Sequence, residues 1–214
     1  SLKETYPDEL ISAYLMGEFV NLKSGTVYNG YDRVRCRSME SIQEKEPVHI
    51  GMDFNVTNMS AVIYVLRGKI YHAIDELKGV YDTPSIIDVI KERFAEHHIS
   101  IYPDASGRAR KSVNASTSDI ALLEQAGFSV YANSRNPLVK DRVMSANKAF
   151  QNGQVMVNDE LCPETARCLE HLTYDNNGEP DKKSNIDHLP DAATYTIAYL
   201  LPISKPMLDI NVRF

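Results

Sequence analysis

Three aspartates stand where apolar segments end or begin. Asp53 closes the run "VHIGMD", Asp104 closes "ISIYPD", and Asp191 opens "DAATYTIAYLL". Three carboxylates that converge without bases repel one another and are forced to hold protons. A pair of Mg²⁺ or Mn²⁺ ions removes this repulsion, because these ions favour oxygen ligands and leave positions open for water and phosphate. If the three aspartates meet, they predict a two-ion metal site.

Such a site suits phosphodiester hydrolysis. Of two ions about 4 Å apart, one lowers the pKa of the attacking water and the other stabilises the leaving oxygen. His188 lies three residues before Asp191. It is placed to assist, either by orienting a metal-binding carboxylate or by handling the proton.

Each of these residues also has a plainer interpretation. Asp53 could cap a turn together with Asn55, and Asp104 could bind the amides of a strand-end turn. Asp191 could do no more than complement the dipole of a helix. His188 could be an ordinary surface histidine. The conjunction of the residues, not any single one, indicates a site.

Two further carboxylates are alternatives. Asp187 could replace Asp191 as a ligand, since residues four apart share one face if the helix begins early. Glu76 could lie near the cluster, although a solvated strand end is the simpler expectation. The sequence alone leaves both open.

The segments that carry these residues predict a mixed α/β sheet. Alternation and turn signals predict strands at 48–54, 60–67, 70–79, 99–104, 128–133 and 154–158, and helices at 83–97, 116–127, 137–153, 162–172 and 189–201, with an exposed loop at 173–186. The helix at 83–97 is expected to have Thr83 as its N-cap.

This order, three antiparallel strands followed by parallel strands and flanking helices, resembles the ribonuclease H-like fold. In that arrangement the first strand is central and the fourth lies beside it in parallel. Asp53 and Asp104 would then be neighbours at the carboxyl edge of the sheet, where such folds form sites. Asp191 would complete the triangle from the last helix.

Composition narrows the class of protein. The length of 214 residues and the hydrophobic content of 43% suit one ordinary domain with a true core. The net charge of −6 argues against a stand-alone DNA-binding module, so any contact with nucleic acid must be local, weak or dependent on another domain. The three cysteines (Cys36, Cys162 and Cys168) match no zinc or redox spacing and are expected to be reduced thiols.

The chain divides into three expected parts. Residues 1–46 are turn-rich and are interpreted as an arm or linker, 47–206 as the sheet domain, and 207–214 as a tail. The start without methionine suggests a fragment of something longer. We find no P-loop, no signal peptide and no apolar run of membrane-spanning length.

Four motifs, in order, resemble the nuclease domain of the large terminase subunit, the DNA-packaging motor protein of tailed, headful-packaging bacteriophages. They are "LMGEFVNLKSGTVYNGYDR", "GMDFNVTNMSAVIY", "IYPDASGR" and "NIDHLPDAATYTIAYLL". The resemblance covers about the whole chain. It implies that Asp53, Asp104 and Asp191 bind the metal, and that His188 matches a histidine of some members.

The resemblance also implies the partners. It implies an ATPase motor domain removed from the N-terminal side, concatemeric double-stranded DNA as the substrate, cut with little sequence preference, and contacts with the portal protein and the small terminase subunit. The expected location is the host bacterial cytoplasm, transiently at the procapsid portal. No basic run accompanies the acids. The scattered candidates for phosphate contact are Arg108, Arg110, Lys111, Lys140, Arg142, Lys182 and Lys183.

Three other interpretations compete. An actin- or Hsp70-like ATPase needs glycines for its phosphate loop, but Asn55 and Val56 stand there and no second loop follows. A resolvase- or transposase-like nuclease of the same fold normally carries more positive charge. A non-catalytic docking module of a packaging motor is the alternative that is not an enzyme.

Overall fold

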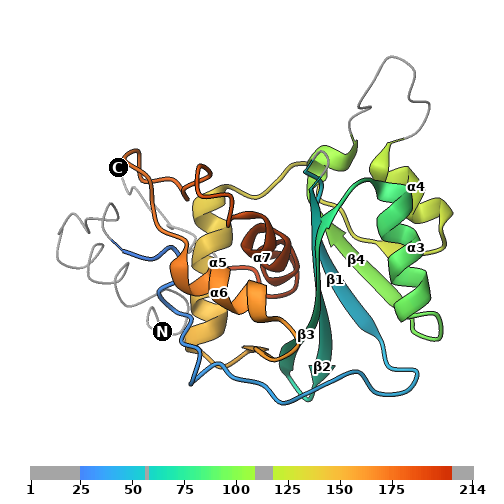
Figure 1. Ribbon diagram of the computed structural model, residues 1–214, viewed down its shortest axis with the longest axis horizontal. Coiled ribbons are helices and arrows are strands. Elements are labelled where there is room, and N and C mark those ends of the chain that lie inside the picture. Colours follow the sequence, from blue (N-terminus) through green and yellow to red (C-terminus); the bar gives the residue numbers. More distant parts are fainter. Residues whose placement is uncertain (1–24, 56–57, 109–117, 204–214) are drawn as a thin grey trace, which may run out of the picture.

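The computed structural model describes residues 25–55, 58–108 and 118–203. In this part of the chain a six-stranded sheet has the order β5-β4-β1-β2-β3-β6, with helices on both faces (Figure 1). The strands are β1 (Val48–Asp53), β2 (Met59–Arg67), β3 (Ile70–Val80), β4 (Ile99–Pro103), β5 (Ser129–Val130) and β6 (Val155–Val157). The predicted ribonuclease H-like mixed sheet is confirmed.

The strand pairing brings two of the aspartates to one edge. β1, β2 and β3 form an antiparallel meander, and β4 lies parallel to β1, with Met52 opposite Pro103. The next residues, Asp53 and Asp104, therefore leave the sheet side by side. β6 instead pairs in parallel with β3 at the far edge.

The helices form two layers. On one face lie α3 (Thr83–Arg93) and α4 (Asp119–Gln125), and on the other lie α5 (Val139–Gln151), α6 (Pro163–His171) and α7 (His188–Leu200) (Figure 1). A single 3₁₀ turn, η1 (Ala105–Arg108), follows β4. None of the helices in the described ranges is long and apolar enough to cross a membrane.

Two details of the elements differ from the prediction. The N-cap of α3 is Asp82, whose carboxylate accepts a hydrogen bond from the backbone N–H of Ser85 at 2.9 Å. Thr83 is already helical, and its hydroxyl donates to Asp119 at 2.6 Å. The strand expected at 128–133 is only two residues long, because the chain leaves the sheet edge after pairing with β4.

Alternation along β1 separates two cores. Val48, Ile50 and Met52 belong to the cluster under α3 and α4. Gly51 faces α7, because a Cβ atom there would lie 2.0 Å from the carbonyl oxygen of Ala192. This glycine permits α7 to pack directly on the sheet.

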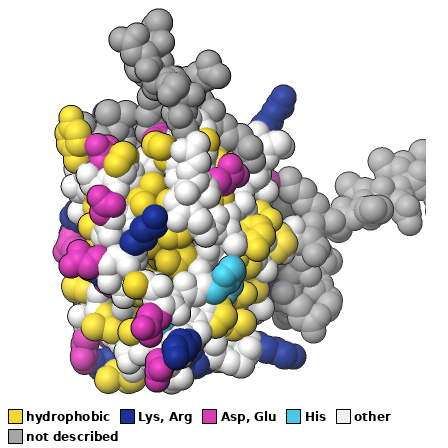
Figure 2. Space-filling view, turned by 90° about the vertical axis from the view of Figure 1, so that its right-hand side faces the viewer, with side chains coloured by type: hydrophobic (Ala, Val, Ile, Leu, Met, Phe, Trp, Pro, Cys, Tyr) yellow, Lys and Arg dark blue, Asp and Glu magenta, His cyan; other side chains and the backbone are white. Residues whose placement is uncertain are grey.

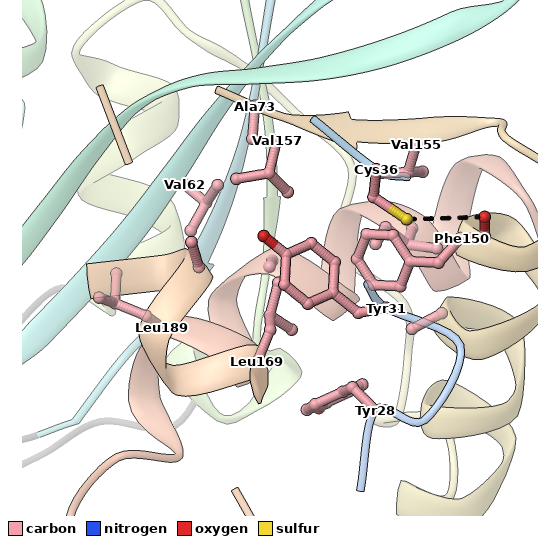
Figure 3. Packing of buried hydrophobic residues seen from close by; sticks show 14 of the residues in the cluster. Tyr28, Tyr31, Cys36, Val62, Ala73, Phe150, Val155, Val157, Leu169 and Leu189 are labelled. Atoms are coloured by element: carbon pink, nitrogen blue, oxygen red, sulfur yellow. Dashed lines mark hydrogen bonds between the residues drawn. The ribbon is translucent and has the colours of Figure 1, made fainter. Parts of the chain in front are cut away.

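The arm contributes to the second core. Tyr28, Tyr31 and Cys36 are buried with residues of α5, α6 and α7, and the rings of Tyr31 and Phe150 meet edge to face at 5.2 Å (Figure 3). Buried Asn147 of α5 holds this segment, accepting from the Gly30 N–H at 2.9 Å and donating to a backbone carbonyl at 3.0 Å. From residue 25 onward the arm thus shares the core of the domain, and the division at residue 46 stays a prediction.

The surface agrees with the mixed charge of the sequence. On the side that carries α3 and α4, basic and acidic side chains are interspersed among apolar ones (Figure 2). All three cysteines (Cys36, Cys162 and Cys168) are buried and unpaired. The predicted thiol state is confirmed.

Candidate active site

A pocket of about 450 Å³ opens at the carboxyl ends of β1 and β4. It gathers side chains from β1 and the turn after it, from the end of β4, from the 173–186 loop and from the start of α7. The lining residues are Asp53, Phe54, Asn55, Asp104, Lys182, Asn185, Asp187, His188 and Asp191. All three predicted ligands and the predicted histidine therefore line one pocket.

Asp53, the last residue of β1, is 8% exposed and is paired with His188. The ring Nδ1 lies 3.2 Å from Oδ2 of Asp53, and this hydrogen bond raises the pKa of His188 although burial opposes it. On the other side, Nε2 lies 2.9 Å from Oδ1 of Asn185. The amide nitrogen of Asn55 lies 3.1 Å from the ring. The imidazole is thus held at a fixed orientation beside the carboxylate.

Asp104 follows β4 and is 9% exposed. Its two oxygens accept from the backbone N–H and the hydroxyl of Ser106, each at 2.8 Å, and the amide of Asn136 also donates to it. Gly107 closes this turn against the ring of Phe54, where a Cβ atom would lie 2.2 Å from the ring. The turn interpretation is therefore correct for Asp104, and the same turn presents it to the pocket.

Asp191 lies in the first turn of α7, as predicted. Nη1 of Arg142, from α5, lies 2.9 Å from its Oδ1 and 3.3 Å from its carbonyl oxygen. Burial raises the pKa of Asp191, and the charge of Arg142 opposes this rise. Arg142 is 4% exposed and stacks 4.3 Å from the ring of Tyr195, so it does not have the surface position expected of a DNA contact.

The two open alternatives separate clearly. Asp187 is 5% exposed, lines the pocket, and has a buried Oδ1 without a hydrogen-bond partner among the described residues; the nearest nitrogen, Nε2 of His188, is 4.0 Å away. Glu76 lies elsewhere. Its carboxylate accepts from the backbone N–H groups of Glu164 and Thr165, at 3.0 and 2.7 Å, and caps α6.

The pocket has the donor set of a divalent-cation site. Four carboxylates supply oxygen atoms, the ligands that Mg²⁺ and Mn²⁺ prefer, and one of these oxygens has no hydrogen-bond partner in the part of the chain that the structure describes. In the described ranges no three His, Cys, Asp or Glu side chains are already arranged to hold a metal ion. The reason lies in the partners that engage the carboxylates of Asp53, Asp104 and Asp191, namely His188, Asn136 and Arg142.

Comparison with known families decides the identity. Residues 50–200 match the family described as the terminase RNaseH-like domain, and the matched segment contains every carboxylate of the pocket. The chain belongs to this family. The predicted resemblance to the nuclease domain of the large terminase subunit is confirmed.

Solved structures show the same fold as this terminase domain. The large terminase of a thermophilic bacteriophage has a TM-score of 0.72 and 19% identity, over 94% of this chain and 51% of that protein. The P22 large terminase nuclease domain gives 0.64 and 13%, over 86% and 97%. The nuclease of thermophilic phage G20c, solved with bound magnesium, gives 0.58 and 12%, over 81% and 96%. No curated protein matches the chain.

The chain thus spans about half the length of the first of these terminases. It covers nearly all of the isolated P22 and G20c nuclease domains. At these identities the likeness shows the fold of the terminase domain and not its activity.

The basic candidates for DNA contact have diverse positions in the terminase domain. Lys182 lines the pocket, and Lys183 and Lys140 are exposed. Arg108 ends η1, and Arg110 and Lys111 lie outside the described residues.

The sequence analysis did not assign Asn136 and Asn185 to the site. Both are loop residues that touch a site side chain. The only local signals are the proline after Asn136 and the left-handed backbone of Asn185 (φ 56°), a conformation that asparagine tolerates well.

Proposed function

We propose that this chain is a divalent-metal-dependent endonuclease that cuts concatemeric double-stranded viral DNA during genome packaging, with little sequence preference. The convergence of Asp53, Asp104, Asp187 and Asp191 in one pocket carries this proposal. Membership of the terminase RNase H-like family supports it, as does the G20c nuclease, which was solved with bound magnesium and with bound cobalt.

Asp53, Asp104 and Asp191 would hold a pair of Mg²⁺ or Mn²⁺ ions, with Asp187 as a fourth oxygen donor. Bound there, the ions would supply a lowered pKa for the attacking water and stabilise charge on the leaving oxygen. The unpartnered Oδ1 of Asp187 supports its inclusion, because a buried carboxylate oxygen without a partner among the described residues is costly.

The protein's own groups position the site and handle protons. Asn185 and Asp53 hold the ring of His188 between them, so it is oriented to take up or release a proton at the pocket. Arg142 compensates part of the negative charge from behind Asp191. Exposed Lys182 and Lys183 are proposed to contact phosphate on the loop that borders the pocket.

The wider assembly is part of the same proposal. The large terminase of the first thermophilic phage extends well beyond the region that this chain covers and was also solved with ATP-gamma-S and with ADP. We infer that an ATPase motor domain, the small terminase subunit and the portal are the partners, that the host bacterial cytoplasm is the location, and that residues 207–214 form a tail. The net charge of −6 agrees with a nuclease that depends on the motor to present DNA.

A non-catalytic docking module is the second candidate. One observation favours it: Asp104 and Asp191 are already engaged by Asn136 and Arg142. A docking module needs no free carboxylates, whereas a nuclease must exchange these partners for metal.

Titration calorimetry with Mn²⁺ separates the two candidates. The native chain should bind Mn²⁺, Asp53→Ala should lose most of this affinity, and Asp75→Ala, a carboxylate paired with Arg93 of α3, should keep it. Nicking of plasmid DNA should require Mg²⁺ or Mn²⁺ and stop with EDTA. No Mn²⁺ binding, or binding undiminished in Asp53→Ala, would favour docking, and metal-independent cutting would defeat the mechanism.

A further inference from the structure

One row of side chains along α7 leads from the carboxylate pocket to an exposed tyrosine. Asp191, Tyr195 and Tyr199 follow at four-residue intervals, so they lie on the same side of the helix. Asp191 lines the pocket, and Tyr199, near the other end, is 38% exposed. The eight residues between Asp191 and Tyr199 correspond to about 12 Å along the helix axis.

A second exposed ring lies beside Tyr199. Tyr131 is 42% exposed, and its ring centroid is 5.9 Å from that of Tyr199. Both rings contact Tyr102 of β4, at 5.4 and 5.1 Å, and Tyr131 is nearly parallel to it, at 17°. Tyr102 is 4% exposed and stacks in turn on His49 at 5.8 Å. A buried aromatic base therefore fixes the two exposed tyrosines.

This tyrosine pair (Tyr131 and Tyr199) is joined to the pocket by two further segments. Tyr102 stands two residues before Asp104, about 7 Å along the strand direction. The segment 131–136 runs from Tyr131 past exposed Arg135 to Asn136, whose amide donates to Asp104. Three independent connections thus place the tyrosine pair beside the proposed catalytic carboxylates.

We propose that Tyr131 and Tyr199 form a stacking platform for an unpaired base of the DNA strand that passes the pocket. This inference rests on the proposed nuclease function. A strand with about 3.4 Å between successive nucleotides covers the roughly 12 Å between Asp191 and Tyr199 in about three to four steps. The ligand is therefore a locally unpaired stretch of DNA, a few nucleotides from the phosphate at the carboxylates.

The charge of the protein explains why such a contact is needed. The chain carries a net charge of −6 and its pocket is lined by four aspartates, so electrostatic attraction for DNA is weak. Stacking on aromatic rings supplies affinity without positive charge. It is also tolerant of sequence, because every base has a π-face, which suits a nuclease with little sequence preference.

The test measures binding of a fluorescein-labelled oligothymidylate to the 214-residue chain in EDTA, where no cleavage occurs. Tyr131→Ala combined with Tyr199→Ala should weaken binding about 5- to 100-fold, the range for loss of one stacked base. Tyr131→Phe combined with Tyr199→Phe keeps both rings and should bind within about 2-fold of the native chain. Tyr81→Ala removes another exposed tyrosine, 69% exposed, and should have no effect.

Salt dependence provides a second readout. The alanine pair should lower affinity without changing the slope of log K against log salt concentration, because stacking releases no counterions. Arg135→Ala should reduce that slope by about 0.7, the value for one phosphate contact on a single strand. A gapped duplex should bind the native chain more tightly than an intact duplex, and the alanine pair should abolish this preference.

Three outcomes would overturn the platform: native affinity in a folded alanine pair, an equal loss in Tyr81→Ala, or no saturable binding by the native chain up to about 100 µM, the weak end of non-specific binding. A failure of the nuclease function is distinguishable, because the binding assay needs neither metal nor cutting. A chain that loses DNA with its tyrosine pair but never cleaves would retain the platform and refute the nuclease.

Discussion

The two faces of the sheet are built in different ways. The core under α3 and α4 consists of apolar side chains such as Ile50, Ile63 and Ile90. The face under α5, α6 and α7 also buries polar and charged groups, among them Arg142 and Asn147. Buried polar groups are costly unless paired, and each pairing fixes a geometry. The comparison teaches that the first face supplies stability, whereas the second sets the positions of the carboxylates.

The largest expected difference between the faces is in activity. Asp53→Asn should reduce plasmid cleavage roughly 10³-fold, because losing a metal ligand removes several kcal/mol of transition-state stabilisation and about 1.36 kcal/mol is a factor of ten. Its melting temperature in EDTA should stay unchanged or rise, since one of four clustered carboxylates is neutralised. Cleavage rates and thermal melts in parallel check both statements.

Asp75→Asn on β3 is the matched control, since Asp75 pairs with Arg93 of α3 at 2.8 Å. It should cleave normally and lose at most about 1 kcal/mol of stability, the usual value of an exposed ion pair. A large loss of stability in Asp53→Asn would instead assign Asp53 a structural role and remove the distinction between the faces.

The second prediction concerns stability. Gly51→Ala should destabilise the fold by about 3 kcal/mol, because the new methyl group would lie 2.0 Å from the Ala192 carbonyl and 2.5 Å from the Thr196 hydroxyl. Since α7 must then move off the sheet, affinity for Mn²⁺ should fall as well. Urea denaturation and calorimetry of the same preparations measure the two effects.

Ile63→Ala sharpens this comparison from the other face. Truncation of this fully buried side chain should cost about 2–5 kcal/mol through the cavity it leaves. Mn²⁺ affinity of the folded fraction should not change, because α3 and α4 hold no ligand. Equal losses of Mn²⁺ affinity in Gly51→Ala and Ile63→Ala would show that the site responds to general destabilisation only.

The third prediction concerns the arm. Asn147→Ala should cost about 1–3 kcal/mol, because it leaves the Gly30 N–H and the Val27 carbonyl without their buried partner. Amide exchange of residues 27–36 should rise with it. Asn152→Ala, an exposed change at the end of the same helix, should leave exchange in the arm unaltered. Uniform exchange across the whole domain would indicate that the arm opens only with global unfolding.

The sequence predicted the parts of the site that follow from chain order. β4 lies beside β1 because a parallel crossover of the expected length joins them, and acidic residues at both strand ends then become neighbours. Asp191 followed from the position of the last helix. These relations depend on topology, which apolar periodicity reveals.

The rest depends on contacts that periodicity does not encode. A charged residue within a helix is normally exposed, so Arg142 was taken for a DNA contact. Its burial becomes visible only when α5 and α7 are packed together and Asp191 is its partner. The same holds for Asn136 and Asn185, which are ordinary loop residues until the fold brings them to Asp104 and His188.

The smallest expected effect is a pH dependence confined to the pocket side. The hydrogen bond with Asp53 raises the pKa of His188 above its ordinary value of 6.5. A folded-state pKa above the unfolded one means that the native state binds more protons, so the stability from this pair is complete below about pH 6.5 and is lost as pH rises through the raised pKa. In EDTA, the urea midpoint of the native chain should therefore fall between about pH 6 and 8 relative to His188→Gln.

Histidines elsewhere give the opposite sign and serve as the internal control. Burial lowers the pKa of His49 and of His72, so their contribution to stability increases as pH rises through the lowered values. Both remain in His188→Gln, and the difference between the two curves isolates the Asp53–His188 pair. Parallel curves across this range would mean that the pair does not form in the metal-free protein, and that Asp53 lies unpaired in the pocket before metal binds.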